Sequence, residues 1–230
     1  MPDIGERYLR ITRRIEDACR RSGRNPGEVT LVGASKTQPP EVLAEAWRAG
    51  LRVFGENRVQ EALAKSRELG SYEIDWHLIG PLQTNKVKPA LDLFRTIQSI
   101  DRPRVAEALD REAGRRGIRL TGLLEVNVGR EESKHGFLPE DLLESARPLA
   151  DLEHLKIVGL MAIPPQEDDP EASRPWFRRL RELRDELAGR SEWPGFPGWL
   201  SMGMSHDYEV AVEEGATHVR VGTLLFGSRT

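Results

Sequence analysis

The sequence predicts an α/β fold, a single (β/α)8 barrel of the TIM type with an extra helix at its N-terminus. Short apolar runs of strand type alternate with helical stretches along the whole chain, a pattern typical of parallel βαβ units. Eight such runs can be counted, the number that closes a barrel of this type. Because 230 residues suit one barrel and no linker or low-complexity tract divides them, we expect one domain over 1–230.

The first predicted element is the extra helix. Ile4, Ile11 and Ile15 recur at the spacing of one helix face, and Gly23 ends the pattern. The strands are predicted at 29–34, 52–54, 74–79, 94–98, 120–128, 155–163, 198–201 and 218–221. The helices between them are predicted at 40–49, 57–69, 84–91, 102–117, 139–150, 171–188 and 206–214.

The charge and composition exclude several classes of partner. The net charge is −3 and the arginines interleave with acidic residues, as on a solvated helix face, so we expect no nucleic-acid partner. No run approaches the roughly 18 apolar residues that span a bilayer, and the N-terminus has no targeting signature. We therefore expect no membrane association and a cytoplasmic location. Cys19 is the only cysteine and no Cys/His cluster is present, so neither an intrachain disulfide nor a metal site is expected.

The loops after the last two predicted strands have the composition of an anion site. Active residues of such barrels come from the carboxyl ends of the strands and the loops that follow them. Ser201, Gly203 and Ser205 follow the seventh strand, and Gly222 and Thr223 follow the eighth. Glycine lets backbone N–H groups approach an anion closely, and the hydroxyl groups add donors. Because barrels frequently bind phosphate at these two loops, we predict a phosphate site there.

Lys36 follows the first strand on the same rim. An amine at the end of an apolar strand is desolvated and better able to attack an aldehyde. An ordinary surface lysine is the simpler interpretation, but a phosphorylated aldehyde would need both the amine and the phosphate loops. Arg220 on the eighth strand either pairs with a buried carboxylate such as Glu125 or lies beside a ligand ring. His77 is compatible with a packed core histidine, and Asn57 with a helix N-cap.

Several segments together resemble a known family, the pyridoxal-phosphate homeostasis proteins of the YggS/PROSC type. Each motif is modest by itself, but the set occurs in order and with family-like spacing from the leading helix to the C-terminus. The matching segments are Leu31–Thr37, Phe54–Glu61, Trp76–Lys86, Glu125–Val128, Glu132–Gly136, Gly159–Pro165, Leu200–Ser205, Val219–Thr223 and Phe226–Gly227.

The resemblance implies a fold like the N-terminal barrel of alanine racemase and pyridoxal 5'-phosphate (PLP) as the cofactor. It implies that PLP forms a Schiff base with Lys36. The phosphate would be held at Ser201, Met202, Gly222 and Thr223.

The resemblance also implies neighbours of the cofactor ring. Arg220 matches the arginine that faces the pyridine nitrogen, and Asn57 and His77 match positions beside the ring. A permanent cation at that nitrogen opposes ring protonation and makes the ring a poorer electron sink than an aspartate partner would. Transamination and decarboxylation are therefore disfavoured, whereas racemization and simple carriage remain open.

Two classes of function follow from the resemblance. The first is a non-enzymatic carrier that limits free PLP and passes it to apo forms of PLP-dependent enzymes. The second is an amino-acid racemase, which needs a second base, typically a tyrosine. Tyr8, Tyr72 and Tyr208 do not occupy an obvious position for that base, so we expect a carrier without catalytic residues. We also expect a monomer. A Schiff-base aldolase is a third option, but it does not explain Arg220.

Overall fold

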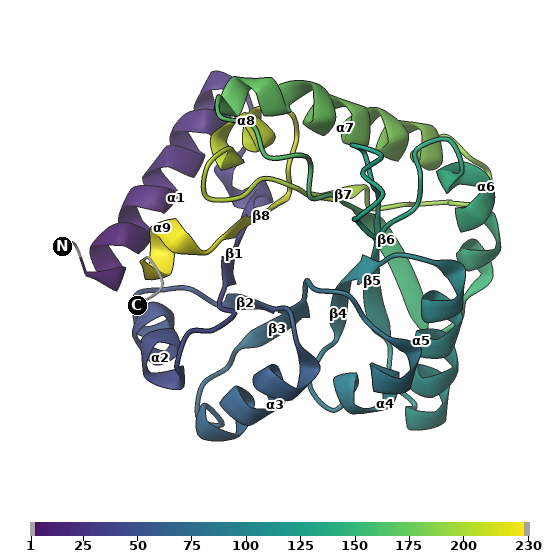
Figure 1. Cartoon of the computed structure of the whole chain (residues 1–230), viewed down its shortest axis with the longest axis horizontal. Helices are drawn as coiled ribbons and strands as arrows, with labels where there is room; N and C mark the ends of the chain where they lie inside the picture. The colour runs from purple at the N-terminus through teal and green to yellow at the C-terminus, as the bar shows by residue number, and fades with distance from the viewer. Residues whose placement is uncertain (1–2, 228–230) are drawn as a thin grey trace.

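In the computed structural model, which describes residues 3–227, eight parallel strands close into a barrel in chain order (Figure 1). The ring is closed by β8 pairing with β1, where Val32 lies opposite Arg220. The predicted fold class is therefore confirmed. The strands are β1 (Thr30–Ala34), β2 (Val53–Glu56), β3 (Asp75–Leu78), β4 (Thr96–Ile100), β5 (Leu120–Glu125), β6 (Leu155–Met161), β7 (Trp199–Ser201) and β8 (His218–Val221).

Helices surround the barrel, and the extra N-terminal helix packs beside the last two and the second (Figure 1). The α-helices are α1 (Ile4–Arg21), α2 (Pro40–Arg48), α3 (Val59–Glu68), α4 (Val87–Ala90), α5 (Pro103–Arg116), α6 (Leu142–Ala146), α7 (Arg174–Ala188), α8 (Tyr208–Glu213) and α9 (Thr223–Phe226). The 3-10 turns are η1 (Pro26–Glu28), η2 (Thr84–Lys86), η3 (Arg147–Asp151) and η4 (Pro170–Ser173). Within residues 3–227, helices of the length and apolarity that a bilayer requires are absent.

Most observed elements differ from the predicted ones by one to three residues at one or both ends; β5 ends three residues earlier than expected and β6 two. The helix expected over 139–150 is shorter, because α6 gives way to η3 where Pro148 lacks the N–H that an α-helix would need. The strands β2 and β4 each end two residues later than expected, at Glu56 and Ile100. The four-residue helix α9 is not among the predicted elements, since one turn is too short to show a periodic pattern.

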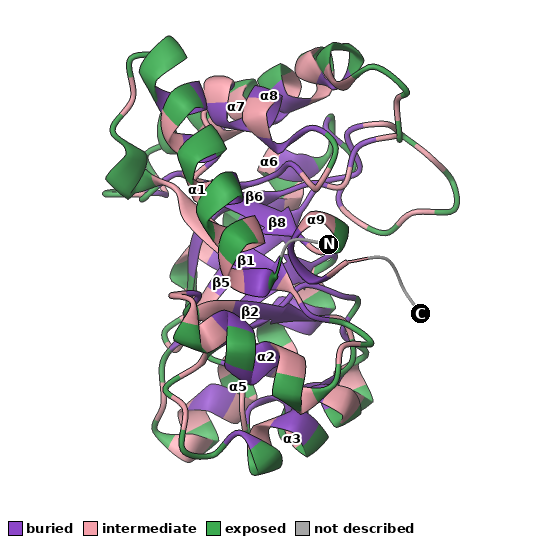
Figure 2. Cartoon of the chain, turned by 90° about the vertical axis from the view of Figure 1, so that its left-hand side faces the viewer, coloured by how far each residue is buried: buried purple, intermediate pink, exposed green. Residues whose placement is uncertain are grey.

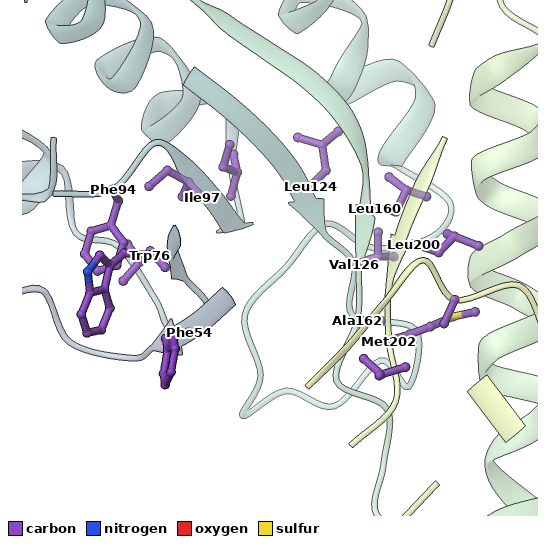
Figure 3. Packing of buried hydrophobic residues seen from close by; sticks show 14 of the residues in the cluster. Phe54, Trp76, Phe94, Ile97, Leu124, Val126, Leu160, Ala162, Leu200 and Met202 are labelled. Atoms are coloured by element: carbon purple, nitrogen blue, oxygen red, sulfur yellow. The ribbon is translucent and has the colours of Figure 1, made fainter. Parts of the chain in front are cut away.

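Alternate residues of each strand face either the helices or the barrel interior. Trp76 of β3 and Leu200 of β7 belong to the large apolar layer between strands and helices (Figure 3). Figure 2 shows this layer as buried strands at the centre of the molecule, with exposed residues on the outer helix faces. His77 and Ser201, which face inward, are buried and polar. The interior of this barrel therefore includes buried polar groups, which need hydrogen-bond partners.

Candidate functional site

A cavity of about 340 Å³ opens at the carboxyl ends of β1 and β8. This is the end at which barrels of this type place their active residues. Five of the sequence-predicted residues line it together: Lys36, Ser205, Arg220, Gly222 and Thr223. The loops after β6 and β7 supply much of the remaining lining, with Pro165, Gln166, Glu167, Met204, His206 and Asp207, and Ala34, Thr37, Gln38 and Gly227 complete it.

Lys36 stands two residues beyond the end of β1, and its side chain is exposed. The desolvation expected for this amine is therefore not present in the structure. The turn that presents it is tight, because Gln38 N–H donates to the Ser35 carbonyl over 3.0 Å and Thr37 has a left-handed φ of 66°. A β-branched residue rarely adopts that conformation, so the surrounding contacts must hold the turn in place.

A buried ion pair lies directly behind this turn. Lys65 Nζ of α3 donates to Glu56 Oε1 over 2.6 Å and to the Ser35 carbonyl over 2.9 Å. The Ser35 hydroxyl donates to the same carboxylate oxygen over 2.6 Å. Glu56 is fully buried. The peptide group that precedes Lys36 is therefore fixed from inside the protein by a charged hydrogen bond.

The Arg220 guanidinium reaches the cavity from the barrel interior, and the residue is 4% exposed. Its Nη1 donates to Ser201 Oγ over 2.6 Å and its Nη2 donates to the Ala162 carbonyl over 2.7 Å. Burial lowers the pKa of Arg220 to about 10, while Glu125 and Asp207 oppose that change, so the group stays charged at neutral pH. Among the described residues the Arg220 guanidinium bonds to Ser201 and Ala162 and forms no ion pair with Glu125, so of the two alternatives left open the direct pair is not the one observed.

The loops after β7 and β8 meet at Ser205, as an anion cradle would require. The backbone N–H groups of Gly222 and Leu224 point at Ser205 Oγ, at 3.3 and 3.5 Å. Gly203 has φ 87°, and a Cβ there would lie 2.5 Å from that of Ala211, so only glycine fits this approach of the loop to α8. Backbone donors, the Ser205 hydroxyl and the Thr223 hydroxyl therefore surround one corner of the cavity.

Four other residues singled out from the sequence do not line this cavity. Asn57 lies on the same rim, one residue after β2, and Arg58 rather than Asn57 is the N-cap of α3. Met202 is fully buried in the apolar layer (Figure 3), and its N–H donates to the His218 carbonyl. Ser201 is fully buried with its hydroxyl engaged by Arg220, so neither it nor Met202 has a free donor for phosphate.

His77 lies at the other end of the barrel interior. Its Nδ1 bonds to Gln98 and its Nε2 to Asp75, and it lines a cavity of about 510 Å³ at the amino ends of the strands. The structure therefore does not place His77 beside a ligand held at Lys36. Strand alternation predicts that His77 faces inward, but its depth along the barrel axis depends on the tilt and register of all eight strands.

Sequence reasoning missed the loop Pro165–Glu167 and the residues His206 and Asp207, which also line the cavity. The available signal was position, because these residues follow β6 and β7, and β7 lies between β6 and β8 in the barrel. Asp207 is buried and its carboxylate accepts from Met204 N–H over 2.7 Å, so it shapes the loop that presents Ser205.

A buried carboxylate pair lies at the ends of β4 and β5. Glu125 Oε2 and Asp101 Oδ1 are both buried without a hydrogen-bond partner among the described residues. Burial first, and then the nearby Asp101 charge, raise the pKa of Glu125 to about 7, while Arg220 opposes the change. Glu125 is thus a proton-holding group near the Arg220 guanidinium.

The chain matches the family model described as "Alanine racemase, N-terminal domain" over residues 21–230. A pyridoxal phosphate homeostasis protein of Aquifex aeolicus is 51% identical over 97% of both chains. The protein of the same name from Escherichia coli K12 is 40% identical over 100% of this chain and 98% of its own.

Solved structures show the same likeness. PipY of Synechococcus elongatus with PLP bound is 39% identical, covers 98% of this chain and 100% of its own, and superposes with a TM-score of 0.85. Alanine racemase of Clostridium difficile is 15% identical with a TM-score of 0.71, and the match covers 56% of the racemase. The racemase likeness extends to the fold alone.

Proposed function

Because the chain belongs to the family of the pyridoxal phosphate homeostasis proteins, we propose that it binds PLP through Lys36 and acts in the homeostasis of that cofactor. The observation that supports this proposal best is one cavity that contains the exposed Lys36 amine, the Arg220 cation and the donors around Ser205. An aldehyde with a phosphate group needs both the amine and the donors. The size of the cavity is within the range of small-molecule sites, which begins at about 300 Å³.

The donor set fits a phosphorylated pyridine. The Gly222 and Leu224 N–H groups converge on one oxygen, as they would on a phosphate oxygen, and a Cβ at Gly222 would lie 3.2 Å from the Ala34 carbonyl. Thr223 starts α9 and adds a hydroxyl group. We propose that Ser205, Gly222 and Thr223 hold the phosphate, in place of the set that included Ser201 and Met202.

PLP, when bound, supplies an aldehyde that condenses with a lysine amine to a Schiff base, in which C=N replaces C=O and water leaves. In this chain Lys36 would donate the amine from the turn that Lys65 fixes. Arg220 would face the pyridine nitrogen and, because it keeps its charge, disfavour a proton there. Asn57 remains a candidate neighbour of the ring on the adjacent strand end.

Carriage is favoured over racemization by the surroundings of the cavity. None of the three tyrosines lines it, and the Tyr208 hydroxyl is buried without a partner among the described residues. A racemase needs a second base opposite the lysine. We therefore propose a non-catalytic role in which the protein holds PLP and releases it to apo-enzymes, as a cytoplasmic monomer. Sustained interconversion of L- and D-amino acids by the loaded protein, followed by chiral chromatography, would instead establish a racemase.

The proposal is tested by trapping PLP covalently on the protein with borohydride. Protein incubated with PLP should absorb in the visible region, and borohydride should fix the cofactor on Lys36, as peptide mapping would show. Lys36→Ala should abolish trapping, whereas Lys156→Ala, a change of an exposed lysine on β6, should leave it intact. Trapping on another lysine, or none in the wild-type protein, would contradict the assignment.

The two anchors should also be separable. Lys36→Ala should still bind PLP without a covalent link, because the donors around Ser205 are unchanged. Pyridoxal, which lacks the phosphate, should bind to that variant roughly 10- to 100-fold more weakly, since it loses one or more charge-assisted hydrogen bonds. Equilibrium dialysis measures both affinities, and inorganic phosphate should compete with PLP. Equal affinities for the two compounds would rule out an anion cradle.

A further inference from the structure

A continuous chain of side-chain hydrogen bonds runs through the barrel interior, from the cofactor cavity toward the opposite end. Arg220 Nη1 donates to Ser201 Oγ over 2.6 Å, and the Ser201 hydroxyl donates to Gln98 Oε1 over 2.6 Å. Gln98 Nε2 and His77 Nδ1 are 2.7 Å apart, and His77 Nε2 lies 3.2 Å from Asp75 Oδ2. The links come from β8, β7, β4 and β3 in turn, so the chain crosses the barrel rather than following one strand.

The direction of these bonds follows from the orientation of the Gln98 amide. Its Oε1 only accepts, so the Ser201 hydroxyl donates to it, while Ser201 Oγ accepts from the Arg220 guanidinium. Gln98 then has only its NH₂ group to offer to His77, so Nδ1 of His77 must be an unprotonated acceptor. His77 therefore has its proton on Nε2, where Asp75 accepts it. The bond from His77 lowers the pKa of Asp75, in accord with a carboxylate acceptor.

A second proton on His77 would disturb this order. Nδ1–H would face the Gln98 NH₂ group, so two donors would meet. Turning the Gln98 amide would satisfy His77, but Ser201 Oγ would then accept from the Gln98 NH₂ group as well as from Arg220. The Ser201 hydroxyl would lose Gln98 Oε1 as the acceptor for its own hydrogen. Protonation of His77 is therefore incompatible with the present orientation of the Gln98 amide and of the Ser201 hydroxyl, the group that accepts from Arg220.

Several titratable or polar groups face His77 at this end of the barrel. His218 of β8 lies with its ring centroid 6.0 Å from that of His77, and burial lowers the pKa of His218 to about 3, so it stays neutral. Thr96 of β4 and Glu28 of η1 line the same cavity, and Asp75 of β3 is the bonded carboxylate. Asp75 is largely exposed and gives solvent access to this end of the chain.

We propose that Gln98 and His77 are positioning residues that orient the Arg220 guanidinium through Ser201, and that the protonation of His77 is transmitted to the cofactor cavity by this chain. The proposal deepens the proposed function, since it assigns a means of tuning PLP binding. Ser201 does not line the cavity, and the proposal assigns it a role as the link between Arg220 and Gln98. The polar interior is otherwise costly, because such positions in barrels are mostly filled by branched apolar side chains.

The test uses nitrogen-15 NMR of the protein without cofactor. His77 should show a protonated Nε2 and an unprotonated Nδ1. As the pH falls and His77 takes its second proton, the Arg220 side-chain resonances should shift with the same midpoint. Gln98→Leu should abolish that linked shift, whereas Thr96→Val, an inward-facing change on the same strand outside the chain, should preserve it. A proton on Nδ1 of His77, or the same linked shift in Gln98→Leu, would overturn the proposal.

A second variant tests the hydrogen-bond chain even if Gln98→Leu does not fold. Gln98→Glu keeps the shape of the side chain, and its carboxylate can only accept, so His77 should have a proton on Nδ1. An unchanged tautomer would refute the chain. PLP affinity, measured separately by dialysis, should fall about tenfold in Gln98→Leu and not in Thr96→Val. If wild-type protein shows the linked shift but no trapping on Lys36, the proposed function is contradicted and the hydrogen-bond chain is supported. If it shows trapping without the linked shift, the proposed function is supported and the hydrogen-bond chain is contradicted.

Discussion

Replacing Lys65 with methionine should lower the free energy of unfolding by about 3 to 5 kcal/mol, the range measured when one partner of a buried ion pair is removed. Glu56 is fully buried, and Lys65 supplies the only cation that bonds to it among the described residues. Its second oxygen, Oε2, has no hydrogen-bond partner there. Without Lys65 the carboxylate would keep only the Ser35 hydroxyl. Urea denaturation at neutral pH measures the loss.

The matched control is Lys88→Met, which removes an exposed lysine from α4 and should change stability by less than about 0.5 kcal/mol. Lys65→Met combined with Glu56→Gln should recover much of the loss, because a neutral amide still accepts from Ser35. A loss below about 1 kcal/mol for Lys65→Met alone would mean that the pair is not buried as described.

The same variant should slow trapping of PLP on Lys36, even where the protein is folded. Lys65 Nζ holds the Ser35 carbonyl, and Thr37 keeps its left-handed conformation two residues later. When that bond is lost, the turn can relax and the Lys36 amine samples more orientations. Trapping rates at saturating PLP, compared with those of Lys88→Met, measure the effect.

Most of the fold could be predicted because the strands and helices of a barrel have local signatures. Alternation identified all eight strands, and the helix periodicity of α1 identified the extra helix. The two failures had different causes. The early end of α6 follows from Pro148, a local signal that the prediction passed over, whereas α9 is a single turn whose existence depends on packing after β8.

The candidate site was predictable in part for the same reason. Lys36, Arg220, Gly222 and Thr223 come together because they follow or end β1 and β8, which are neighbours once the barrel closes. The positions of His77 and Ser201 along the barrel axis could not be predicted, since the depth of an inward-facing side chain depends on strand tilt and shear.

The Lys65–Glu56 ion pair also could not be predicted from the sequence. The two residues are nine apart, on a strand and on the following helix, a spacing that no local rule connects. Lys65 therefore resembled any other charge on a solvated helix face until the packing of α3 against β2 was known.

Glu125→Gln should remove a pH dependence of stability that the wild-type protein shows between about pH 4.5 and 7. Burial first, and then the charge of Asp101, raise the pKa of Glu125 to about 7 in the folded protein. The folded state therefore binds the proton more tightly than the unfolded state does. The contribution of this group is fully present below the unfolded pKa and is lost as the pH rises through the folded pKa.

The size of the effect follows from the shift in pKa. Between pH 4.5 and 8 the wild-type protein should lose up to about 3 kcal/mol of unfolding free energy through Glu125, and Glu125→Gln should not. Urea denaturation at both pH values gives the difference between variant and wild type, which should grow with pH. Glu107→Gln, a change of an exposed glutamate on α5, should show a constant difference. If the difference for Glu125→Gln were equally constant, Glu125 would be ionised in the folded protein throughout this range, and the carboxylate pair near Arg220 would hold no proton at neutral pH.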